Sequence, residues 1–127
     1  MKSAYLLSDA GDLYPLVAEV LVSRGAVIAL DGSRVVQWAD DAGRLLTIFG
    51  PQGSEFEAEL REPATSPTGV PVDVSGLSAC VAECRSEAFV ASTVRMLAAA
   101  IPGALWLLDS NGIVWPASEV DPTQIAL

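Results

Sequence analysis

Four short apolar segments follow one another between residues 26 and 60, and the sequences between them are typical of tight turns. These intervening sequences are Asp31-Gly32-Ser33, Asp40-Asp41-Ala42-Gly43 and Gly50-Pro51-Gln52-Gly53-Ser54. Short gaps rich in Gly, Asp and Ser favour strands that pair with their neighbours in the chain. The pattern therefore predicts an antiparallel meander with strands at residues 26–30, 34–39, 44–49 and 56–60.

Ahead of this meander, one segment has the apolar spacing of an amphipathic helix. Apolar side chains repeat at intervals of three and four residues at Leu13, Leu16, Val17, Val20 and Leu21. Pro15 is compatible with the first turn of a helix, and Gly25 is a natural stop after the last turn. We expect a helix over about residues 12–24, with Ser8 and Asp9 as candidate caps.

A second helix is predicted from Ser86 to the Pro102-Gly103 stop. Ser86 is a favourable N-cap, and Glu87 complements the positive end of the helix. The apolar positions that follow at helical spacing are Val90, Val94, Leu97, Ala98 and Ile101.

Further strands are predicted at residues 4–7, 77–84, 104–108 and 113–115, and Asn111-Gly112 between the last two is a strong hairpin signal. The element order is β-α-β-β-β-β-β-α-β-β. Such an order favours an α+β fold in which two helices pack on a single, largely antiparallel sheet. We expect one domain over residues 1–127, with a Pro-rich surface loop at about residues 61–76.

The charge of the chain excludes several classes of function. The sequence has 16 acidic and 7 basic residues, a net charge of -9 and no histidine. Nucleic-acid binding requires clustered basic residues, which are absent, so no nucleic-acid partner is expected. The missing histidine removes the commonest general base and the commonest metal ligand.

The sequence also indicates the compartment. The apolar stretch at residues 4–7 is too short for a signal peptide. Charged residues interrupt the longer apolar runs at residues 13–30 and 88–108, whereas a spanning helix needs about 20 predominantly apolar residues. We therefore expect a cytoplasmic protein without a membrane partner.

Cys80 and Cys84 lie in a segment predicted to be extended. At roughly 3.3 Å per residue their Cα atoms would be about 13 Å apart, too far for a disulfide. Zinc would need further Cys or His ligands that the sequence lacks. We interpret both cysteines as small buried hydrophobes rather than redox or metal-binding groups.

The predicted strand at residues 56–60 concentrates negative charge. If it is extended, Phe56, Ala58 and Leu60 face the core. The opposite face then presents a row of carboxylates about 7 Å apart, from Glu55, Glu57 and Glu59. Asp40, Asp41 and Glu62 would extend this row at its margin. Two interpretations remain open: a surface that binds a cationic partner, or a solvated sheet face or charged edge strand.

Carboxylates also supply the only acid–base chemistry that the composition readily permits. Asp31, Glu83 and Asp109 lie at predicted strand ends, where a facing pair is conceivable, but turn or capping roles are the stronger interpretation for Asp31 and Asp109. Serine nucleophiles lack a histidine, and neither a Walker A loop nor a dinucleotide fingerprint occurs. We expect no catalytic residue, no cofactor and no metal.

The three tryptophans are interpreted as structural residues. Trp38, Trp106 and Trp115 are expected to be large core residues with the indole N–H satisfied at a sheet margin.

The C-terminal third of the chain resembles small bacterial immunity proteins, which are encoded beside polymorphic or secreted toxins. The resemblance covers mainly residues 80–127. It rests on Cys-Val-Ala-Glu-Cys-Arg-Ser-Glu-Ala-Phe from Cys80, on Trp-Leu-Leu-Asp-Ser-Asn-Gly-Ile-Val-Trp-Pro-Ala from Trp106, and on Val120-Asp121-Pro122. The resemblance implies a protein that neutralises a cognate toxin by binding it. No functional residue carries over from the family, because the matching positions look structural.

Charge and resemblance together favour a non-enzymatic immunity protein whose acidic surface covers the basic active site of a toxin domain. The alternative is a cytoplasmic adaptor or secretion chaperone that binds a partner segment in an apolar groove.

Overall fold

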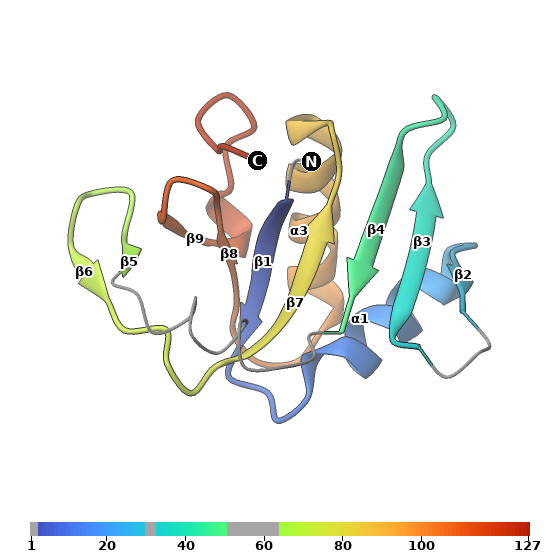
Figure 1. The fold of residues 1–127 in the computed structure, drawn as a ribbon, viewed down its shortest axis with the longest axis horizontal. Coiled ribbons are helices and arrows are strands. Elements are labelled where there is room, and N and C mark those ends of the chain that lie inside the picture. Colours follow the sequence, from blue (N-terminus) through green and yellow to red (C-terminus); the bar gives the residue numbers. More distant parts are fainter. Residues whose placement is uncertain (1–2, 30–32, 51–63) are drawn as a thin grey trace.

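A seven-stranded sheet carries two α-helices on one face (Figure 1). The computed structural model describes residues 3–29, 33–50 and 64–127. The strand order is β2-β3-β4-β7-β1-β8-β9, and every neighbouring pair is antiparallel. The strands of this sheet are β1 (Ser3–Ser8), β2 (Val27–Ile28), β3 (Val35–Ala39), β4 (Leu45–Phe49), β7 (Ser78–Glu83), β8 (Leu105–Leu108) and β9 (Val114–Pro116).

The predicted α+β class and element order are confirmed. The helices are α1 (Leu13–Ser23) and α3 (Glu87–Ala100), and a short 3-10 helix, η1 (Ala117–Glu119), follows β9. The predicted strand at residues 56–60 lies outside the described residues. Within the predicted loop at about residues 61–76, β5 (Ala64–Thr65) and β6 (Pro71–Val72) pair as a separate two-stranded sheet.

Helix α1 ends as the sequence predicts. Gly25 has a φ of 100°, its N–H donates to the Val22 carbonyl, and the Ala26 N–H donates to Leu21. This pair of hydrogen bonds is a Schellman motif, which needs the left-handed conformation that glycine adopts without strain.

The start of α1 differs from the prediction, because Ser8 and Asp9 do not cap it. Asp12 occupies the N-cap position, and the Leu13 N–H donates to Ser78 Oγ on β7 at 2.8 Å. Ser8 Oγ donates to the Ala104 carbonyl, and the Ala104 N–H donates to Asp9. These two residues instead connect the end of β1 to the chain entering β8, a long-range contact that local capping patterns do not reveal.

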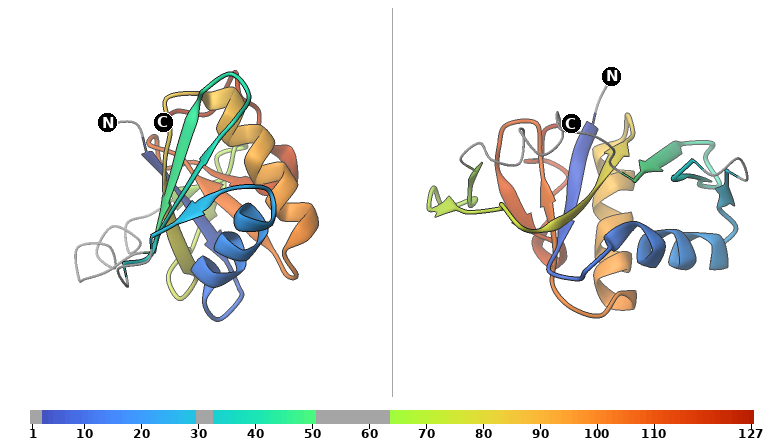
Figure 2. Two further views of the ribbon diagram at one scale, coloured as in Figure 1. Left: turned by 90° about the vertical axis from the view of Figure 1, so that its right-hand side faces the viewer. Right: turned by 60° about the horizontal axis from the view of Figure 1, so that its bottom comes forward.

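Two apolar clusters fill the two faces of the sheet. The larger lies between the sheet and both helices and includes Val17 and Leu21 of α1 and Val90 and Leu97 of α3. The smaller cluster lies on the opposite face, where the β5–β6 hairpin and Val74 cover β1, β8 and β9. In the right-hand view of Figure 2, the hairpin lies at the end of the molecule away from α1.

Candidate functional site

The structure describes only part of the predicted acidic surface. Glu55, Glu57, Glu59 and Glu62 lie outside the described residues. Asp40 and Asp41 form the turn between β3 and β4, at one end of the sheet.

Asp40 is committed to this turn. Its carboxylate accepts hydrogen bonds from the Ala42 N–H at 3.0 Å, the Arg44 N–H at 2.8 Å and Arg44 Nε at 2.5 Å. Desolvation raises the pKa of Asp40, but the hydrogen bonds and positive charge of Arg44 outweigh it and leave the pKa below its ordinary value. Asp41 beside it is exposed and is therefore the more available contact.

A half-open groove of about 670 Å³ lies next to this turn, within the size range of ligand-binding clefts. It forms where β4 and β7 part. Their pairing ends at Thr47 and Glu83, after which β7 bends into α3. The groove is lined by Gly43, Arg44, Leu45, Thr47, Glu83, Cys84, Arg85 and Ser86.

Arg44 lines this groove, and several contacts hold its side chain in place. Besides binding Asp40, it donates from Nη1 to Ser86 Oγ at 3.2 Å, and its guanidinium lies 5.4 Å from the centre of the Phe89 ring. Ser86 is the N-cap of α3, as predicted, because its Oγ accepts the Phe89 N–H. Phe89 also contacts Trp38, with 5.5 Å between the centres of the two rings.

The other charged residues of the groove are not engaged in this way. Within the described residues, Glu83 and Arg85 have no ion-pair or side-chain hydrogen-bond partner. Glu83 is half-buried and Arg85 is exposed. The groove therefore offers one negative and one positive side chain to a ligand.

The carboxylates proposed as a catalytic pair are not brought together. Asp31 lies outside the described residues. Asp109 is buried and accepts a hydrogen bond from Trp115 of the apolar cluster on the helix side of the sheet. Glu83 alternates with Ala82 and Cys84, whose side chains are on that side, and so faces the other way. The turn role of Asp109 is confirmed, since the N–H groups of Asn111 and Ile113 donate to its Oδ1.

Asp109 also accepts the indole N–H of Trp115, the kind of contact that the sequence predicts for the tryptophans. Trp115 is buried and donates its indole N–H to Asp109 Oδ2 at 3.1 Å. Its position as a core residue with a satisfied N–H at the sheet margin agrees with the sequence prediction. Trp106 is half-buried against the smaller apolar cluster.

Both cysteines are free and buried, which confirms the prediction that they form no disulfide and act as core residues. Burial raises the pKa of the Cys80 thiol to about 12. Such a thiol stays protonated near neutral pH, so it is a poor nucleophile and a poor metal ligand. Among the described residues, no group of three or more Cys, Asp or Glu side chains is arranged to hold a metal ion.

No protein-family model, curated protein or solved structure matches this chain. None of the helices described by the structure is long and apolar enough to cross a membrane.

Proposed function

We propose that this chain is a non-enzymatic, cytoplasmic immunity protein, which binds a cognate toxin domain and blocks its active site through an acidic surface. The observation that supports this proposal best is a net charge of -9 on a chain in which several arginines bind groups of the chain itself. Arg34 pairs with Asp12, Arg44 pairs with Asp40, and Arg95 donates to the Val120 carbonyl. Exposed acids such as Glu19, Asp41 and Glu119 remain on the surface.

This charge distribution suits a partner with a basic cleft. An acidic surface accelerates the encounter with such a partner and disfavours acidic competitors. The proposed contact residues are Glu55, Glu57 and Glu59, with Asp40, Asp41 and Glu62 at the margin. Because Asp40 is held by Arg44, we expect Asp41 to contribute more to binding than Asp40 does.

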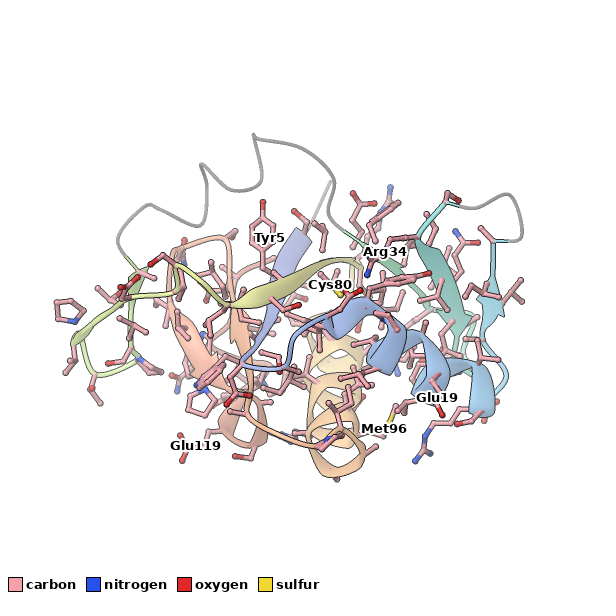
Figure 3. The ribbon with its side chains drawn as sticks, turned by 90° about the horizontal axis from the view of Figure 1, so that it is seen from below. Tyr5, Glu19, Arg34, Cys80, Met96 and Glu119 are labelled. Atoms are coloured by element: carbon pink, nitrogen blue, oxygen red, sulfur yellow. The ribbon has the colours of Figure 1, made fainter. Side chains whose placement is uncertain are left out.

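Calorimetry with the product of the adjacent gene tests the proposal. We expect a stable complex whose affinity falls at least about tenfold between low and high salt, because surface charges are screened. Glu57→Lys is expected to weaken binding by a similar factor. Glu19→Lys on the outer side of α1 makes the same change in net charge and should have a much smaller effect (Figure 3).

Two results would contradict this proposal. Absence of binding to the adjacent gene product would contradict the immunity function. Equal losses for Glu57→Lys and Glu19→Lys would show that net charge acts without the proposed surface.

The groove between β4 and β7 supports a second candidate, an adaptor or secretion chaperone that binds a partner segment. The exposed Leu45 side chain in its wall suits an apolar contact. Apolar binding changes little with salt, so the salt dependence of the same titration separates the two functions.

A further inference from the structure

The backbone of Leu45 faces the groove between β4 and β7. The Asp40 N–H donates to the Arg44 carbonyl and the Gly50 N–H donates to Arg34, so the even-numbered residues of β4 bond to β3. In an antiparallel ladder, the odd-numbered residues then direct their N–H and C=O groups to the other neighbour, β7. Thr47 therefore directs its N–H and C=O groups toward β7, and Leu45 directs its own groups to the same side.

Leu45 lacks the strand partner that Thr47 has. Thr47 pairs with Glu83, and the next position in this register would place Arg85 opposite Leu45. Strand β7 ends at Glu83, and within the described chain the pairing goes no further. An N–H and a C=O of Leu45 thus point into an open groove, as at the edge of a sheet that accepts an additional strand.

The side chains around these groups specify a ligand of both charges. Glu83 and Arg85 are two residues apart and line the same groove, and neither has a side-chain partner within the described residues. Leu45 is 51% exposed beside them. In an extended ligand, side chains two residues apart lie on one face, about 7 Å from each other, so two of them can face this pair of charges.

We infer that the groove between β4 and β7 binds an extended segment of the protein partner, in which a basic and an acidic residue stand two positions apart. The segment bonds through its main chain to Leu45, its basic residue pairs with Glu83, and its acidic residue pairs with Arg85. This inference rests on the proposed function in that the segment belongs to the partner that the chain binds. It adds a second contact surface to the proposed acidic one.

Synthetic peptides test the groove without the partner. Pentapeptides that alternate valine with charged residues are titrated into the full chain, and the amide signals are followed by nuclear magnetic resonance. The mixed peptides Val-Lys-Val-Glu-Val and Val-Glu-Val-Lys-Val cover both orientations. We expect one of them to bind about fivefold more tightly than Val-Gln-Val-Gln-Val and to shift the Leu45 amide signal most strongly.

Variants of the groove provide the controls. Glu83→Gln and Arg85→Gln should each reduce the advantage of the mixed peptide, because each removes one of the two ion pairs, whereas Glu19→Gln on α1 and Arg24→Gln at its C-cap should preserve it. The combined Glu83→Arg and Arg85→Glu change should favour the mixed peptide of opposite order. Glu83→Gln alters no charge of a described ion pair, so it keeps the test usable if the double variant does not fold.

The inference is overturned if the mixed peptides bind no better than the neutral one, or if the shifted amides lie away from the groove. Its failure differs from failure of the proposed function. Peptide binding without binding to the adjacent gene product would contradict the immunity function and support the groove as a binding site. The reverse result would contradict the groove alone.

Discussion

Replacing Asp109 by alanine is expected to lower the free energy of unfolding by about 3 to 5 kcal/mol. Asp109 is only 4% exposed, and its carboxylate accepts four hydrogen bonds. The N–H groups of Asn111 and Ile113 donate to Oδ1 at 2.9 and 3.0 Å. Trp115 Nε1 and the Ala126 N–H donate to Oδ2 at 3.1 and 3.3 Å. The substitution leaves these donors without this acceptor and removes one of the hydrogen bonds between the hairpin turn and the C-terminal segment, of which the bond from the Ser110 N–H to the Ala126 carbonyl remains.

Urea unfolding followed by circular dichroism measures this loss. Asp109→Asn should be intermediate, because its amide group accepts at one oxygen only. Asp73→Ala is the matched control: Asp73 also accepts two hydrogen bonds in a turn, both from Ser75, but it is exposed, so its loss should stay below about 1 kcal/mol. A loss at Asp109 no larger than the loss at Asp73 would contradict the structural role of the buried carboxylate.

The second large effect is a loss of stability at alkaline pH caused by Cys80. Burial raises the pKa of this thiol from 9.0 to about 12, although the charge of Arg34 opposes the rise. Figure 3 shows Cys80 and Arg34 near one another beside the start of α1. The unfolded thiol ionises first, so the stability is fully present below pH 9 and is lost as the pH rises toward 12. The loss approaches about 1.4 kcal/mol per pH unit and about 4 kcal/mol in total.

Unfolding free energies of the wild type and of Cys80→Ala between neutral pH and pH 11 test this effect. Cys80→Ala removes the thiol, so it should be less stable at neutral pH but lose less stability as the pH rises. The pKa of Tyr14 is raised by burial and further by the charge of Cys80, so both pH profiles are measured in a Tyr14→Phe background. Parallel pH profiles for the two proteins would show that Cys80 does not titrate differently on unfolding.

The elements that sequence reasoning predicted are those whose signals are local. The Asn111-Gly112 turn forms as expected, with a φ of 77° at Gly112, and Gly25 and Ser86 end and begin their helices. The sheet order was not predictable in the same way. Strand β7 lies between β4 and β1, although the long segment at residues 50–77 separates it from β4 in the chain. Such a placement depends on long-range packing, which no short motif specifies.

The same distinction applies to the candidate site. Alternation predicted the acidic face of residues 55–59, which lies outside the described residues and stays a prediction. The groove was not predicted, because it exists only where β4 and β7 diverge. The sequence places Glu83 at a predicted strand end, as one member of a facing carboxylate pair, but the structure places it in this groove and directs it away from Asp109. Asp40 was predicted as a contact residue, and its three hydrogen bonds within the turn limit that role.

The most direct test of the immunity function is growth of cells that produce the adjacent gene product, with and without this chain. The proposal predicts that the gene product alone arrests growth and that co-production of this chain restores it. A variant with Glu55, Glu57 and Glu59 changed to lysine should restore growth poorly at equal protein level. Growth arrest that this chain leaves unchanged, although the protein accumulates in folded form, would contradict the proposed function.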